Sequence, residues 1–181
     1  MKDLAAWHAF AKTLAHVDPN RVGMFGSSMG GSMVIQYAAD HPDIRAIVAD
    51  SAFSSLDDTV KVSVPHQTGL PAFPYAPLIV LWAEREAGFD SASIDAKRWV
   101  GKISPRPILL LQGGRDAFIS PDSGQRLYEA AGEPKELWFD PDVEHTQFDR
   151  DRPEEFEQRV AGFFEKYLSG ATGAPGATGA R

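Results

Sequence analysis

The chain has 181 residues, of which 43% are hydrophobic and 24% charged, with a formal net charge of -7 at pH 7 and no cysteine. These values fit one globular domain and exclude disulfides, thiolate catalysis and zinc–thiolate sites. The negative charge argues against nucleic acid as a partner, and no apolar run approaches the roughly 20 residues of a membrane helix. The first residues lack the apolar stretch of an export signal, so we expect a cytoplasmic protein.

The first predicted element is an amphipathic helix. Its apolar face comprises Leu4, Trp7, Ala11 and Leu14, which recur at helical spacing, and it ends before the turn at Pro19.

A strand, a helix and a second strand follow. Residues 22–25 (VGMF) and 44–50 (IRAIVAD) are apolar runs typical of buried parallel strands, and 29–40 is predicted to be the helix between them. That helix ends before Pro42, because the residue before a proline disfavours the α conformation.

Residues 51–104 look less regular. The pattern Ser54-Ser55-x-x-Asp58 indicates a capped helix start, but the prolines that follow argue against a continuous helix: Pro65, Pro71, Pro74 and Pro77. We expect an irregular, cap-like excursion over one edge of the sheet.

The last third of the chain returns to a regular alternation. Strands are predicted at 107–112 and 135–139, with a helix from about Pro121 between them. A final helix begins near Pro153 and has an apolar face: Phe156, Val160, Phe163, Phe164 and Tyr167. Alternating strands and helices predict an α/β fold with a mostly parallel sheet and helices on both faces. Residues 1–168 form this core, and the Gly/Ala-rich residues 169–181 are predicted to be a disordered tail.

The segment Gly26-Ser27-Ser28-Met29-Gly30 fits the pattern G-x-S-x-G and lies between a predicted strand and a predicted helix. In such a turn the central serine, Ser28, is a candidate nucleophile, and both glycines let strand and helix approach without Cβ clashes. The amide of Met29 would donate to an oxyanion at the helix N-terminus. The alternative is a turn needed only for packing, whereas Walker and dinucleotide-binding loops fail on residue identity.

A serine nucleophile needs a base and a group that orients the base. His145 follows the strand at 135–139, and Asp116 follows the strand at 107–112, so both lie at the carboxyl edge of the sheet with Ser28. Asp50 also ends a strand on that side and is a second candidate for the orienting carboxylate. Of the other histidines, His66 is predicted to line the entrance.

The chain order Ser, Asp, His is that of the α/β-hydrolases. The segments "DPNRVGMFGSSMGGSMVIQYAADHPDIRAIVADSAFSSL", "SPRPILLLQGGRDAFISP" and "DPDVEHTQF" resemble that superfamily over residues 1 to about 168, and are most similar to bacterial hydrolases related to prolyl-oligopeptidase and serine-aminopeptidase domains. The resemblance implies Ser28 as nucleophile, His145 as general base and then acid, and Asp116 as the carboxylate that fixes the imidazole tautomer. No metal or cofactor is implied.

The chain departs from a full α/β-hydrolase in lacking the strands that precede its first helix. No segment before Ser28 resembles the loop that donates the second oxyanion-hole amide, and losing one such donor costs about 100- to 1000-fold in turnover. The strand Val22–Phe25 would then lie at a sheet edge. We expect self-association, a homo-oligomer formed through this edge or through the apolar surface that the absent elements would cover.

The leading functional hypothesis is a serine carboxylesterase acting on a small-molecule ester. The excursion carries Leu70, Phe73, Tyr75, Trp82 and Phe89, which are candidate walls of a substrate pocket or, alternatively, residues that pack the excursion onto the sheet. The other hypotheses are a peptidase-type hydrolase and a non-catalytic interaction module.

Overall fold

Four parallel strands form one sheet in the computed structural model, which describes residues 1–169. They are β1 (Val22–Ser27), β2 (Ile44–Asp50), β3 (Ile108–Gly113) and β4 (Lys135–Asp140), in the spatial order β1-β2-β3-β4. The predicted α/β class and parallel sheet are confirmed. Strand β1 lies at an edge, as expected, whereas the self-association expected through it stays a prediction. The predicted tail lies outside the described residues except for Ser169.

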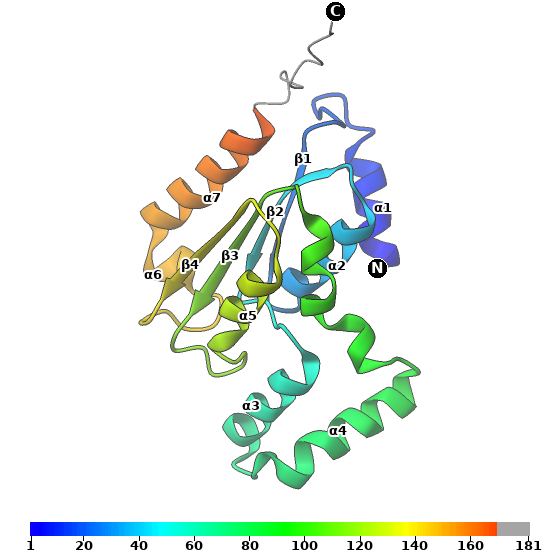
Figure 1. The fold of residues 1–181 in the computed structure, drawn as a ribbon, viewed down its shortest axis with the longest axis vertical. Coiled ribbons are helices and arrows are strands. Elements are labelled where there is room, and N and C mark those ends of the chain that lie inside the picture. The colour runs from blue at the N-terminus through cyan, green and yellow to red at the C-terminus, as the bar shows by residue number, and fades with distance from the viewer. Residues whose placement is uncertain (170–181) are drawn as a thin grey trace, which may run out of the picture.

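Helices cover both faces of the sheet (Figure 1). Helices α2 (Met29–Asp40) and α5 (Asp122–Ala130) cover one face, and α7 (Pro153–Leu168) covers the other together with the short α6 (Phe148–Asp151). The side chains of β2 alternate between the two cores: Ile47 and Ala49 join the first, and Ala46 and Val48 join the second. This alternation explains why β2 is continuously apolar from Ala46 to Ala49.

Helix α1 (Lys2–Ala11) exists as predicted, and Leu4 of its predicted apolar face packs against the core, but Trp7 does not. The residue that it buries is His8, whose Nδ1 lies 3.0 Å from the hydroxyl oxygen of Tyr37 on α2. Burial lowers the pKa of His8, which favours the neutral ring. Trp7 is 69% exposed and packs edge-to-face on Phe10, so this residue of the predicted apolar face does not join the core.

The excursion at 51–104 is more helical than expected. It forms α3 (Leu56–Thr68) and α4 (Ala72–Ala87), which pack together beyond the carboxyl edge of the sheet (Figure 1), followed by three short 3₁₀ turns at 91–94, 96–98 and 100–103. The start of α3 was predicted, although the Leu56 N–H is capped by Asp95 Oδ1 at 3.1 Å.

The expectation of an irregular segment was wrong, although no helix is continuous across the four prolines: α3 ends at Thr68 and α4 begins at Ala72. Pro65 lies within the last turn of α3. Pro77 follows a kink at Phe73, whose φ of -98° and ψ of 132° are not helical, so Pro77 falls near the start of the regular part of α4. The first N–H groups of a helix have no acceptor within it, and a proline there loses little. No described helix has both the length and the apolar character needed to cross a membrane.

The two glycines of the motif, Gly26 and Gly30, differ in how much space surrounds them. A Cβ at Gly26 would collide with the backbone carbonyl of Gly30, so Gly26 permits the close approach of β1 and α2. The same prediction for Gly30 was wrong, because no atom lies within 4 Å of where its Cβ would be. The second tight position is Gly31, where a Cβ would lie 3.0 Å from the Cβ of Ala52.

We expect Gly26→Ala to lower the free energy of unfolding by about 1–3 kcal/mol, the usual cost of overpacking. Gly30→Ala is the matched control, and it should leave the free energy unchanged or raise it by ~0.5–1 kcal/mol, because alanine favours a helix over glycine. Urea denaturation followed by circular dichroism measures both. Equal losses in the two variants would contradict this account of the turn.

Candidate active site

Ser28 occupies a sharp bend between β1 and α2. Its φ of 56° and ψ of -123° lie outside the ordinary region for a residue with a Cβ, and its N–H donates to the backbone oxygen of Asp50 at 2.8 Å. The bend leaves the Ser28 side chain half-buried at the carboxyl end of β1. Met29 is the first residue of α2, so its N–H is among those that have no acceptor within the helix.

His145 lies within hydrogen-bonding distance of both Ser28 and Asp116. Its Nε2 is 2.9 Å from the Ser28 Oγ, and its Nδ1 is 2.7 Å from the Asp116 Oδ2. An ionised carboxylate only accepts, so this contact places the proton of the neutral ring on Nδ1 and leaves Nε2 free to accept from the Ser28 hydroxyl. These residues come from three separate segments: the bend after β1, the loop after β3 and the loop after β4.

The Asp116 carboxylate is fixed in place by the backbone. Its side chain is fully buried, and its Oδ1 accepts the N–H groups of Phe118 at 2.9 Å and Ile119 at 2.8 Å. The side-chain amide of Gln112 lies 3.5 Å from Oδ2. The oxygen that faces His145 therefore has a set orientation before any substrate binds.

Asp50, the alternative orienting carboxylate, has different partners. Its Oδ1 accepts from the Ser51 hydroxyl at 2.9 Å, and its Oδ2 lies 3.4 Å from the Ser27 Oγ. Burial raises the pKa of Asp50 to about 6, although the Ser51 hydrogen bond and the charge of His145 oppose the shift. Asp116, and not Asp50, thus contacts the ring of His145.

Phe118 was missed by the sequence analysis. Its ring centroid lies 5.3 Å from that of His145 and 5.5 Å from that of His66 on α3, and the Ser63 hydroxyl donates to its backbone oxygen at 2.9 Å. His66 thus contacts Phe118, which lies against His145, and a position of His66 at the entrance stays a prediction. The available signal was that Phe118 stands two residues after Asp116 in a loop at the carboxyl edge of the sheet.

The predicted pocket walls are exposed on and before α4. Phe73 is 80% exposed and Trp82 is 66% exposed, so these two side chains do not pack the excursion onto the sheet. Leu70 and Tyr75 are also exposed, and contact of any of the four with a substrate stays a prediction.

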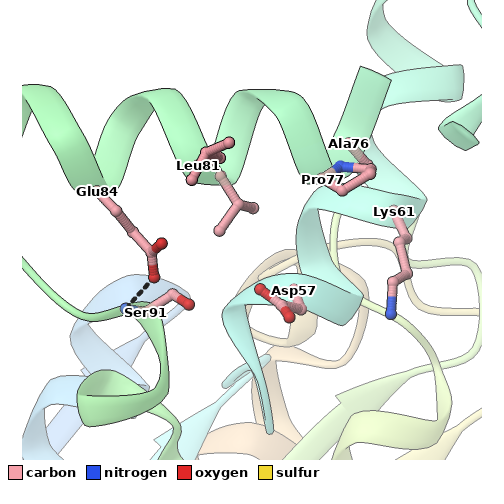
Figure 2. A pocket seen from close by; sticks show the side chains of 8 residues that line it. Asp57, Lys61, Ala76, Pro77, Leu81, Glu84 and Ser91 are labelled. Carbon is pink, nitrogen blue, oxygen red and sulfur yellow. Dashed lines mark hydrogen bonds between the residues drawn. The ribbon is translucent and has the colours of Figure 1, made fainter. Parts of the chain in front are cut away.

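A cavity of 190 Å³ between α3 and α4 has other lining residues (Figure 2). They are Asp57, Lys61, Ala76, Pro77, Val80, Leu81, Glu84 and Ser91. The carboxylate of Glu84 accepts the N–H of Ser91 at 2.8 Å, and this contact fastens the end of α4 to the first 3₁₀ turn. Within residues 1–169, no three His, Asp or Glu side chains gather as the ligands of a metal would.

Comparison with known proteins identifies relatives of the whole described fold. The prolyl oligopeptidase family matches residues 1–171. The uncharacterized protein YfhR of Escherichia coli (strain K12) is 29% identical over 138 residues, which are 75% of this chain and 42% of that protein. The uncharacterized protein Rv2307c of Mycobacterium tuberculosis is 30% identical over 145 residues, or 80% of this chain and 43% of that protein.

Solved structures share the same fold. The esterase Pf2001 of Pyrococcus furiosus has a TM-score of 0.72 and 25% identity, with 92% of this chain and 61% of that chain covered. The acylaminoacyl peptidase of Pyrococcus horikoshii has a TM-score of 0.70 and 18% identity, with 92% of this chain and 27% of that chain covered.

The chain spans less than half the length of these curated relatives. Its sheet, its helices on both faces and its motif segments nevertheless fall within the shared part. The match to the family extends over nearly the whole chain. The chain therefore belongs to the prolyl oligopeptidase family and has a partial α/β-hydrolase fold.

Proposed function

We propose that this chain is a serine hydrolase that cleaves carboxylic esters through an acyl-enzyme intermediate. The observation that carries the proposal is the continuous path of hydrogen bonds from Ser28 through His145 to Asp116. The bend that strains Ser28 adds support, because strained backbone conformations concentrate at functional sites.

The chemistry begins with attack of the Ser28 Oγ on the ester carbonyl carbon, while His145 Nε2 takes the hydroxyl proton. Asp116 stabilises the imidazolium that forms, and the Met29 N–H donates to the oxyanion. His145 then protonates the departing alcohol, which leaves an ester between Ser28 and the acyl group. A water molecule, deprotonated by His145, attacks this ester; the bond between the acyl carbon and Ser28 Oγ breaks, His145 returns the proton to Oγ, and the acid is released.

The esterase named among the structural neighbours favours an ester substrate, and it is 25% identical to this chain. Membership of the prolyl oligopeptidase family favours the alternative, a peptidase-type hydrolase. Turnover of matched p-nitrophenyl ester and p-nitroanilide substrates distinguishes the two. The ester proposal predicts faster release from the ester, beyond the difference in the intrinsic reactivity of the two substrates.

The decisive experiment is labelling with a fluorophosphonate, in which a serine oxygen displaces fluoride from phosphorus. We expect the folded protein to be labelled at Ser28, as mapped by mass spectrometry, because His145 activates that hydroxyl. Heat-denatured protein is the control and should remain unlabelled. Absence of label on folded Ser28 would instead favour a non-catalytic interaction module. The edge strand β1 suits that role, because its unpaired backbone groups can pair with another chain.

A further inference from the structure

Three described residues other than glycine have a positive φ, and all three lie around the candidate active site. They are Ser28 at 56°, Ser51 at 49° and Thr146 at 55°. Such conformations are uncommon for residues with a Cβ and persist only where the surrounding structure holds them.

Hydrogen bonds through Asp50 connect the three residues. Its backbone oxygen accepts the Ser28 N–H at 2.8 Å, and its Oδ1 accepts the Ser51 hydroxyl at 2.9 Å. The Ser51 Oγ in turn accepts the N–H of Thr146 at 3.1 Å, and Thr146 directly follows His145. Asp50 and Ser51 are both buried, so water does not compete readily for these bonds.

We propose that Asp50 and Ser51 are positioning residues that hold the His145 loop against the end of β2, so that the imidazole stays within reach of Ser28. This role rests on the proposed hydrolysis by Ser28. It differs from that of Asp116, which contacts the imidazole itself. Asp50 and Ser51 act instead on the backbone, by accepting the N–H of Ser28 and the N–H of Thr146.

The ionisation of Asp50 should control this contact. The groups that face Asp50 are Ser27 on β1, the adjacent Ser51, His145 in the loop after β4 and Asp149 on α6. Burial raises the pKa of Asp50 to about 6, and the charge of Asp149 adds to the rise. Above this pH the carboxylate only accepts, so it keeps the Ser51 hydroxyl hydrogen on its own side. The Ser51 lone pairs then remain available to the Thr146 N–H.

Below this pH the carboxyl group gains a hydrogen-bond donor of its own. The Ser51 hydroxyl hydrogen is then no longer directed by a charged acceptor, and the contact with Thr146 is weakened. The ionised form, present above pH 6, is therefore the form that holds the loop.

The first test replaces the carboxylate while keeping its size. We expect Asp50→Asn to lower kcat for a p-nitrophenyl ester by about 10- to 100-fold with little change in KM, as for a misplaced catalytic group. Below pH 6, log(kcat/KM) should fall more steeply with decreasing pH in the native protein than in Asp50→Asn. The reason is that protonation of Asp50 adds a loss of activity that the variant does not have. A merely structural role would not change this slope.

The second test removes the hydroxyl at Ser51. Ser51→Gly relieves the positive φ, so it tests the contact even if Asp50→Asn does not fold. We expect a similar loss in kcat, and the double variant Asp50→Asn/Ser51→Gly should be no slower than the slower single variant. Ser54→Gly is the matched control: Ser54 is a buried serine of the same loop that contacts Ser123, and this variant should retain its kcat.

Unchanged kcat in both single variants, or losses that multiply in the double variant, would overturn the inference. Ser28→Ala is measured in parallel. If Ser28→Ala abolishes turnover while Ser51→Gly and Asp50→Asn remain fully active, only the positioning role fails. If Ser28→Ala remains active, the proposed function fails and the positioning role fails with it.

Discussion

Ser28→Ala should reduce ester turnover by up to about 10⁶-fold. A complete serine-triad site loses about 10⁶-fold when its nucleophile is removed. The measurement is steady-state release of p-nitrophenol at pH 8, together with the initial burst, which should disappear.

Ser27→Ala is the matched control for this experiment. The Ser27 Oγ lies 3.4 Å from an oxygen of Asp50, whereas the Ser28 Oγ lies 2.9 Å from His145 Nε2. The Ser27 variant should keep most of its turnover and its fluorophosphonate label. If Ser27→Ala loses activity and Ser28→Ala does not, the nucleophile has been assigned to the wrong hydroxyl.

Asp116→Asn should lower kcat by about 10⁴-fold while the fold remains intact. The comparable substitution in a complete site costs about 10⁴-fold, because an amide that faces the imidazole favours the wrong tautomer. Asn retains an oxygen that can accept from the N–H groups of Phe118 and Ile119, so the loop after β3 should keep its path. Circular dichroism and ester turnover measured on the same sample check both statements.

Asp140→Asn serves as the control for charge. Asp140 also ends a strand at the carboxyl edge of the sheet, but it pairs with Arg152 at 2.9 Å. Its replacement should leave ester turnover nearly unchanged. A similar loss in both variants would mean that net negative charge at this edge matters more than the contact with His145.

The sequence was most informative where chemistry and local pattern coincide. Val22 to Asp50 reads as strand, turn, helix and strand, and the structure has those elements, with the helix at 29–40 and the second strand at 44–50 as predicted. Ser28, Asp116 and His145 could be nominated because each follows a strand of a parallel sheet, whose carboxyl ends meet at one edge. Their catalytic roles stay predictions until the variants are measured.

The remaining features depend on contacts between distant segments. The burial of His8 depends on Tyr37, a residue 29 positions away, and the helical spacing around Trp7 carries no sign of it. Ser51 and Thr146 lie 95 positions apart, and their contact requires the loop after β4 to return to β2. The regular helices α3 and α4 were not expected from a segment with four prolines, because the cost of a proline depends on its position within a helix.

Strands β1 and β4 are the two outermost strands of the sheet, and Ser28 follows one of them while His145 follows the other. The relative position of Ser28 Oγ and His145 Nε2 therefore depends on all the strand pairings between β1 and β4. Fraying of either outer strand should part these two atoms while most of the secondary structure remains. On gentle heating, catalysis should thus fade at a lower temperature than the helical signal, and ester hydrolysis would report on the integrity of the whole sheet.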